Sequence, residues 1–167
     1  DCSRIDGDAE PWSCNLEYSF DGKSWEPLEA TDDLGATAYI VTLENAGDKV
    51  YFRGDNPDGF NSLDLDTMGK KYGIFFAMSM EYEDASVSVS GNIMSLVDPE
   101  MKATEIPGEA GCFYCLFLTD FSIMRSAGQL LLPATTLKPA CYMNMFAWQD
   151  RMLDAPDLPA ETLARYC

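Results

Sequence analysis

The sequence predicts a mainly β protein, with an antiparallel β-sandwich head over residues 1–100 and a short solenoid tail of repeats over residues 101–167. Three observations lead to this prediction. Short runs of β-forming residues, separated by Gly, Asp and Asn turns, fill the first hundred residues. No apolar stripe of ten or more residues at helical spacing interrupts these runs. From about residue 112 onward the sequence repeats itself, which is typical of stacked units.

The expected strands of the head follow one another along the chain. In residues 16–25 the apolar side chains alternate with polar ones, and Asp21-Gly22 is a favoured hairpin turn that places Trp25 on the return strand. Further strands are expected at residues 36–43, 49–54, 72–82 and 85–93, which are rich in β-formers or alternate strictly. About six short strands without intervening helices favour an antiparallel sandwich over βαβ units.

Charge divides the chain in the same place. Residues 1–100 carry 21 acidic and 6 basic side chains, whereas residues 101–167 carry 7 and 5. The change falls near residues 97–111, where Pro and Gly interrupt the periodicity. The net charge of −17 argues against binding nucleic acid or an anionic bilayer through bulk electrostatics. No stretch approaches the roughly 18 consecutive apolar residues of a membrane-spanning helix, so no transmembrane segment is expected.

The chain has no histidine, which excludes Ser-His-Asp and Cys-His catalysis and any metal site that needs an imidazole. Carboxylate, Tyr, Lys or Cys chemistry would remain for an enzyme. The cysteines are even in number, as in an exported protein, and lie at positions Cys2, Cys14, Cys112, Cys115, Cys141 and Cys167. Cys2 and Cys14 are expected to form a disulfide that closes a short N-terminal loop.

The repeat is seen most clearly in two six-residue runs. Residues 132–137 read LPATTL and residues 158–163 read LPAETL, an offset of 26 that the following cysteines keep. Upstream, CFYCLF at 112–117 matches CYMNMF at 141–146 with an offset of 29, so the first copy carries about three extra residues. Stacking of such units predicts a continuous buried column, formed by Leu132, Leu137, Cys141, Leu158, Leu163 and Cys167.

The last repeat has a second consequence. Residues 158–167 present Leu158, Leu163 and Tyr166 without a following polar cap. A terminal unit needs such a cap, so we expect a partner or further polypeptide to cover this end.

Four other patterns have a functional interpretation and a simpler one. Cys112-x-x-Cys115 could be a redox pair or half a zinc site, but core thiols are favoured because no second such motif and no histidine accompany it. Residues 55–66 contain several oxygen-bearing side chains, which are Asp55, Asp58, Asn61, Asp64 and Asp66. A solvent-exposed acidic loop is the favoured interpretation, and a calcium-binding loop is the alternative.

The other two patterns concern carbohydrate chemistry. Asp64 and Asp66 could be proposed as a glycosidase pair with Trp12, Trp25 and Tyr18 lining a sugar site, but nothing in the sequence indicates a cleft. Residues 18–25 lack one residue of a sialidase-type Asp box and are interpreted as a hairpin. No catalytic residue, cofactor or metal is therefore predicted.

The repeat also carries a family resemblance. The run CYMNMFAWQDRMLDAPDLPAETLARYC, with LPATTL before it and SGNIMSL at residues 90–96, resembles the leucine-rich repeats of the BspA-like surface proteins of Bacteroidetes. In that family the repeat recurs many times, often behind a β-rich domain. This chain departs from the family pattern in two places. The usual GCxSL run is replaced by LTDFSIM in one copy and by AWQDRML in the other, and the expected APxL run is replaced by Gln129-Leu130-Leu131 in the first copy. The resemblance spans about residues 14–167 and implies a leucine-rich-repeat-like tail of about two degenerate units.

The resemblance implies a non-enzymatic, secreted or cell-surface protein that binds a protein or a glycan in adhesion. The alternative is a structural subunit of a virion fibre, surface appendage or envelope assembly, which would dock neighbouring subunits through the repeat tail. An envelope-bound accessory that captures glycans is a third possibility. These functions differ in their partners and share the absence of a catalytic site.

Overall fold

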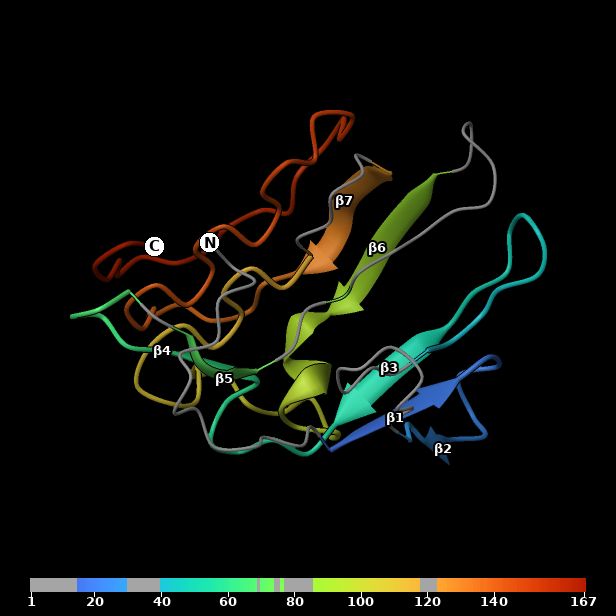
Figure 1. The fold of residues 1–167 in the computed structure, drawn as a ribbon, viewed down its shortest axis with the longest axis horizontal. Coiled ribbons are helices and arrows are strands. Elements are labelled where there is room, and N and C mark those ends of the chain that lie inside the picture. Colours follow the sequence, from blue (N-terminus) through green and yellow to red (C-terminus); the bar gives the residue numbers. More distant parts are fainter. Residues whose placement is uncertain (1–14, 30–39, 69, 74–75, 77–85, 118–122) are drawn as a thin grey trace.

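The fold is β-rich and is seen here in a computed structural model that describes residues 15–29, 40–68, 70–73, 76, 86–117 and 123–167 (Figure 1). Within these residues it contains one short 3-10 helix, η1, at Ile93–Leu96. The strands are β1 (Leu16–Ser19), β2 (Glu26–Pro27), β3 (Tyr51–Gly54), β4 (Asn61–Leu63), β5 (Lys70–Gly73), β6 (Val87–Asn92) and β7 (Met124–Leu131). They form one three-stranded and two two-stranded sheets among the described residues.

The three-stranded sheet has the order β2-β1-β3 and is antiparallel throughout. It confirms that the chain forms a hairpin here, with β1 paired to β2. The expected two-residue Asp21-Gly22 turn is wrong, because the connection spans residues 20–25, and Trp25 precedes the return strand instead of lying in it. The Asp21 carboxylate shapes this connection, since it accepts hydrogen bonds from the backbone N–H groups of Lys23 and Ser24, both at 2.7 Å. These bonds hold the pKa of Asp21 well below its ordinary value.

The other expected strands have mixed outcomes. β3 confirms the strand predicted at residues 49–54, and β6 confirms the one at 85–93. The strand expected at 36–43 is wrong over residues 40–43, which are described and form none, while residues 36–39 lie outside the described residues. β5 overlaps the start of the strand expected at 72–82, of which residues 74–75 and 77–82 also lie outside.

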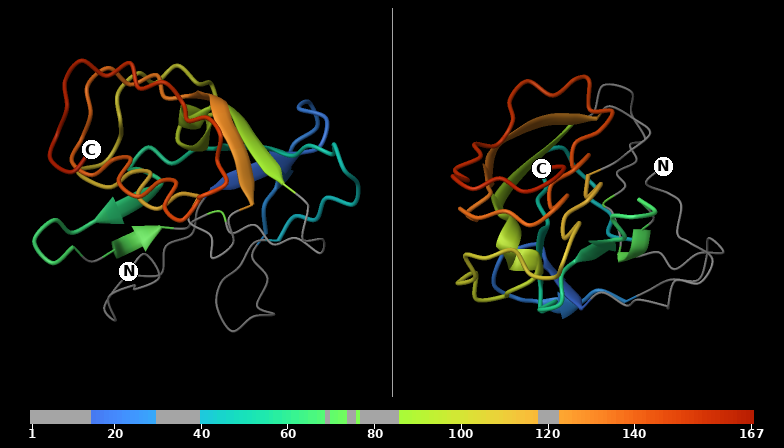
Figure 2. Two further views of the ribbon diagram at one scale, coloured as in Figure 1. Left: turned by 90° about the horizontal axis from the view of Figure 1, so that it is seen from above. Right: turned by 90° about the vertical axis from the view of Figure 1, so that its left-hand side faces the viewer.

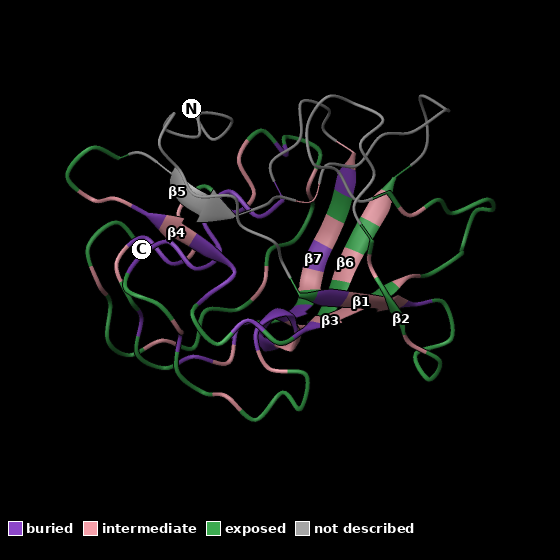
Figure 3. Cartoon of the chain, turned by 60° about the horizontal axis from the view of Figure 1, so that its bottom comes forward, coloured by how far each residue is buried: buried purple, intermediate pink, exposed green. Residues whose placement is uncertain are grey.

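β6 pairs with β7, and the two strands run parallel. The register joins Val87 to Met124 and Asn92 to Leu131. A parallel partner was not expected for a strand assigned to an antiparallel head. This ladder connects segments on the two sides of the predicted boundary near residue 100, and Figure 3 shows the alternation of buried and exposed positions along β7.

One hydrophobic core also includes residues from both sides of that boundary. Leu16, Phe60 and Met94 belong to the same buried cluster as Phe113 and Leu137. η1 enters this cluster directly after β6, because the Asn92 side chain accepts a hydrogen bond from the Met94 N–H and caps the helix. The head and tail segments are therefore packed against each other among the described residues.

The repeats of the sequence have matching backbone conformations. We call residues 111–139 the first unit and residues 140–165 the second unit. Gly111, Ala140 and Tyr166 each precede a repeat cysteine, and their φ angles are +74°, +53° and +64°. The same left-handed conformation at three equivalent positions confirms that the offsets of 29 and 26 are offsets of structure as well as of sequence. Figure 2 shows the corresponding turns following one another as neighbouring loops, coloured yellow, orange and red.

Hydrogen bonds join the two units along their length. The turn of the first unit donates from the Phe113, Cys115 and Phe117 N–H groups to carbonyls of the second unit at 2.8–3.0 Å. Beyond the turn, the Leu153 N–H donates to the Arg125 carbonyl at 3.0 Å. A parallel bridge pairs Thr136 with Thr162. The second unit therefore lies alongside the first, with an offset of 29 at the turns that becomes 26 at Thr136 and Thr162.

Candidate binding surface

The turns of the two units differ sharply in burial. In the first unit, Phe113, Cys115 and Leu116 are completely buried. In the second unit, Tyr142 and Phe146 are half-buried and Asn144 is exposed. The first turn is covered on both sides, whereas the second turn forms an open edge of the described structure.

The predicted leucine column is only half correct. Leu132, Leu137 and Cys141 are buried, but Leu158 and Leu163 are 47% and 66% exposed. Cys167 is exposed as well. The expectation that all six side chains are buried is therefore wrong for the last three, because burial of a repeat position requires a neighbouring unit on each side. The exposure of Leu158 and Leu163 is what the lack of a polar cap predicts for the chain by itself, and the partner or further polypeptide expected to cover this end stays a prediction.

Large exposed apolar side chains are concentrated in the last twenty residues of the sequence. Trp148, Leu153 and Leu163 are 69%, 70% and 66% exposed. We call the set the apolar edge, and its members are Trp148, Leu153, Leu158, Leu163 and Tyr166. Single exposed apolar residues are ordinary on a protein surface, but several on one short segment are typical of an interaction site.

The backbone at this edge has unused hydrogen-bond donors. Tyr142, Asn144 and Phe146 are equivalent, at the offset of 29, to the three residues whose N–H groups join the first unit to the second. In the part of the chain that the structure describes, no acceptor faces their N–H groups. The edge therefore combines exposed apolar side chains with a row of free backbone donors.

The cysteines separate into free thiols and one bridged residue. Cys112, Cys141 and Cys167 are free, whereas Cys115 is in a disulfide whose partner lies outside the described residues. Burial raises the pKa of the Cys112 thiol to about 12, which makes it a poor nucleophile. Cys112 and Cys115 are therefore not joined to each other in a redox pair.

The predicted Cys2–Cys14 disulfide lies outside the described residues and stays a prediction. The chain has no cysteines other than the six named above. A bridged Cys115 and a Cys2–Cys14 bridge are consequently alternatives within a single chain. Peptide mapping without reduction would distinguish them.

The acidic loop forms turns. Asn61 is buried and donates its side-chain N–H to the Tyr114 carbonyl at 2.9 Å. The Asp64 carboxylate accepts from the backbone N–H groups of Asp66 and Thr67. Within the described ranges no group of three or more His, Cys, Asp or Glu side chains is arranged to hold a metal. Trp12, one of the aromatic residues considered for a sugar site, lies outside these ranges.

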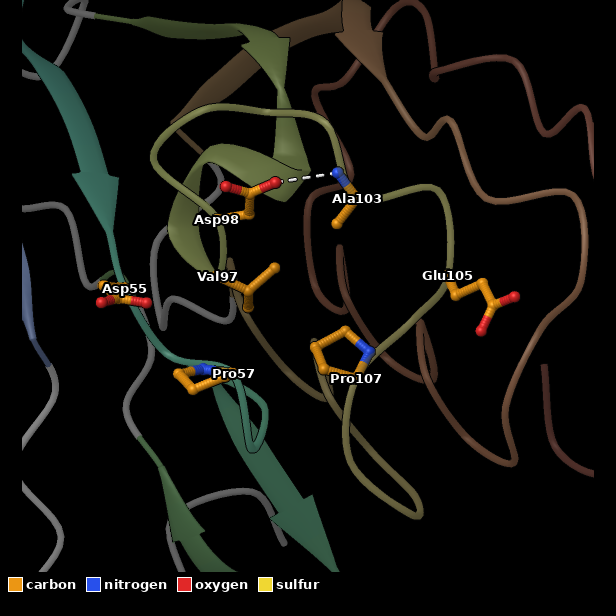
Figure 4. Close-up of a pocket in the computed structure, with 7 residues that line it drawn as sticks. All are labelled: Asp55, Pro57, Val97, Asp98, Ala103, Glu105 and Pro107. Atoms are coloured by element: carbon orange, nitrogen blue, oxygen red, sulfur yellow. Dashed lines mark hydrogen bonds between the residues drawn. The ribbon is translucent and has the colours of Figure 1, made fainter.

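A cavity of about 350 Å³ lies beside the end of β3 (Figure 4). Its acidic wall includes Asp55, Asp98 and Glu105. Asp98 stabilises the loop that follows it, because its carboxylate accepts hydrogen bonds from the backbone N–H groups of Ala103, Glu100 and Lys102. These hydrogen bonds, the one from Ala103 first, lower the pKa of Asp98 and shape the loop. The remaining lining residues are Pro57, Val97, Ala103 and Pro107.

Two aromatic side chains of the three-stranded sheet region are paired with charged residues. Arg53 lies over the Trp25 ring at 4.2 Å from its centroid and pairs with Glu17 at 2.6 Å. Tyr18 donates its hydroxyl to Glu26 at 2.9 Å. Trp25 therefore packs on the hairpin beneath a guanidinium group, which covers one face of its ring.

Comparison with protein-family models, curated proteins and solved structures finds no match to this chain. The proposed function therefore rests on the geometry of this chain alone.

In the described ranges, no helix combines the length and apolar character needed to cross a bilayer. The sequence analysis identified Leu158, Leu163 and Tyr166 as exposed at the open edge. It missed Trp148 and Leu153, whose position in the last unit could have indicated that they are exposed too.

Proposed function

We propose that this chain is a non-enzymatic, secreted or cell-surface binding protein that recognises a protein partner through the apolar edge. In this proposal residues 101–167 are a leucine-rich-repeat-like solenoid tail of the BspA-like kind, behind an antiparallel β-sandwich head. Two observations on the second unit carry it: the N–H groups of Tyr142, Asn144 and Phe146 have no acceptor among the described residues, and Trp148 and Leu163 of the same unit are exposed.

The direction of the hydrogen bonds defines the partner. The backbone bonds from Phe113, Cys115 and Phe117 that join the two turns all run from an N–H of the first unit to a carbonyl of the second. The open turn therefore offers donors, and a partner must supply acceptors such as backbone carbonyls. Apolar side chains on the partner would cover Leu153 and Leu163. A polypeptide segment meets both requirements, as in recognition by β-strand addition.

The same geometry disfavours the structural alternative in its simplest form. Two copies that meet through the same edge would bring the donors of one Tyr142–Phe146 turn against the donors of the other. A symmetric dimer at this edge would therefore leave these groups without acceptors, which is costly when they are buried. A subunit of a fibre or envelope assembly would instead need a different face of its neighbour.

Further support for a non-enzymatic, exported role comes from the titratable groups. Hydrogen bonds lower the pKa of Asp21, Asp98 and Asp154, which moves these carboxyls away from general-acid chemistry. The disulfide at Cys115 is typical of an oxidising compartment.

The test uses the full chain and a defined probe. A synthetic peptide of residues 139–167 contains the carbonyls of Pro139, Cys141, Met143 and Met145 that the first unit binds within the chain. We expect the labelled peptide to bind the full chain, and a Leu153→Lys, Leu163→Lys variant to weaken binding at least tenfold. A fluorescence-anisotropy titration measures both.

The matched control is Leu43→Lys, which replaces an exposed leucine in the loop before β3, away from the tail in Figure 1. It should bind as the unmodified chain does. Two results together would favour glycan capture over protein recognition. The chain would fail to bind the peptide, and it would bind glycans on an array equally well with and without the Leu153→Lys, Leu163→Lys substitutions. A concentration-dependent increase in mass that the edge variant abolishes would favour the assembly subunit.

A further inference from the structure

Two free cysteines meet where the second unit ends. The sulfur atoms of Cys141 and Cys167 are 3.5 Å apart. Cys141 is completely buried, while Cys167 is exposed and its thiol donates to the Lys138 carbonyl at 2.8 Å. The pair therefore has one protected thiol and one thiol that solvent can reach.

The backbone holds the pair in position. The Ala140 N–H, one residue before Cys141, donates to the Arg165 carbonyl at 2.8 Å. Chains hydrogen-bonded side by side lie about 4.8 Å apart, and cysteines joined in a disulfide have Cα atoms roughly 4.4–6.8 Å apart. Both cysteines follow a residue with left-handed φ, Ala140 and Tyr166. A bond between the sulfurs thus requires only a small movement, which the exposed Cys167 can make.

The chain already contains a disulfide, at Cys115. A compartment that oxidises one thiol of this protein can oxidise others that are accessible. Cys112 is the third cysteine of the repeat position, but it is completely buried within the core cluster and shielded from an external oxidant.

We propose that Cys141 and Cys167 are an oxidisable dithiol whose disulfide fastens the end of the second unit to its own beginning. The oxidant is a disulfide, such as oxidised glutathione or a disulfide-donating oxidoreductase. The Cys167 thiol loses its proton and attacks one donor sulfur, so that a mixed disulfide forms and one donor thiol leaves. Cys141 then loses its proton and attacks the Cys167 sulfur, releasing the second donor thiol. The protein loses two protons and two electrons, and the donor is reduced to two thiols.

The two thiols have different parts in this exchange. Burial, together with the hydrogen bond to Cys167, raises the pKa of Cys141. The first attack therefore falls to the exposed Cys167, and the attack by Cys141 is the slower step. The product closes a 26-residue span of chain and holds the apolar edge in place.

The experiment treats the folded full chain with oxidised glutathione, alkylates it in denaturant without reductant, and maps the peptides. We expect Cys141 and Cys167 in one linked peptide pair, with Cys112 alkylated. The linked Cys115 peptide is an internal control that disulfides survived the work-up. Oxidation should also raise the Tm by roughly 5–10 °C, and Cys167→Ser should abolish that increase without lowering the Tm of the reduced protein.

Four results would overturn the proposal. The first three are recovery of both Cys141 and Cys167 as alkylated peptides, arrest at a Cys167 mixed disulfide with glutathione, and a Cys167 disulfide between two chains on a non-reducing gel. Oxidation that links the pair but leaves the Tm unchanged would show that the bond forms without fastening the unit, which also contradicts the proposal. None of these readouts depends on binding at the apolar edge, so the outcome is independent of the proposed function.

Discussion

Phe117 stacks on Phe146, 29 residues further along the chain, with ring centroids 5.5 Å apart and planes inclined by 14°. Phe76 also stacks on Phe117, with ring centroids 5.8 Å apart. Phe113 and Tyr142 make a parallel contact one turn earlier, also 29 residues apart. Equivalent aromatic residues of successive units therefore pack on each other, as equivalent positions do in repeat proteins.

A double-mutant cycle on this pair tests the repeat register. The single variants Phe117→Leu and Phe146→Leu and the double variant should give a coupling energy of about 0.5–1.5 kcal/mol, since stacked rings contribute beyond the area they bury. Urea unfolding supplies the free energies. Additive losses would mean that the rings are neighbours without an energetic connection.

The leucine positions provide the second prediction. Leu137→Ala should destabilise the protein by roughly 2–5 kcal/mol, because it empties a core position that is 4% exposed. The equivalent Leu163→Ala, at a position 66% exposed, should change stability by no more than about 0.5 kcal/mol. Denaturant midpoints of the two variants measure the difference. Equal losses would indicate that the second unit is covered in solution.

The third prediction compares two glycines. Both Gly111 and Gly47 have positive φ, but a Cβ at Gly111 would lie 2.6 Å from the Leu63 Cβ, whereas a Cβ at Gly47 would meet nothing within 4 Å. Gly47→Ala should cost about 1–2 kcal/mol from backbone strain alone. Gly111→Ala should cost roughly 1–3 kcal/mol more, from overpacking. Thermal and urea unfolding check this order, and similar losses for both would refute the close approach of the first unit to β4.

The fourth prediction concerns acid. Backbone and side-chain donors lower the folded-state pKa of Asp98 and Asp154 below the value of about 3.9 in an unfolded chain. Their contribution to stability is therefore complete above that pH and is lost as the pH falls through the folded-state pKa. The urea midpoint should be flat near neutral pH and decrease below about pH 4.

Asp98→Asn identifies the source of that decrease. It removes one charged acceptor from the loop, so the variant should be less stable at neutral pH and should lose less on acidification. A midpoint curve for the variant that runs parallel to the unmodified curve down to about pH 3 would show that Asp98 has no part in the acid response.

Local and repeated features were the ones that could be predicted from the sequence. The hairpin at residues 16–27 depends on neighbours in the chain, and the unit offsets could be read directly from near-identical runs. The parallel pairing of β6 with β7 could not be predicted, because the two strands are separated by more than thirty residues and alternation does not specify a partner. Leu137 and Leu163 occupy the same repeat position, so only their neighbours in space distinguish the core residue from the exposed one. The disulfide at Cys115 was missed for the same reason, since connectivity depends on the fold.

The common direction of the turn-to-turn hydrogen bonds also has an electrostatic consequence. Each peptide group in such a row contributes a dipole of about 3.5 D, and parallel dipoles add as they do in a helix. The N–H groups of Tyr142, Asn144 and Phe146 form the positive pole of this row. In a molecule of net charge −17, the open turn is thus a place where fixed partial charges are positive. Because these charges belong to the backbone, side-chain substitution or a change of pH cannot remove them, and carbonyl or carboxylate groups that approach the tail are favoured there.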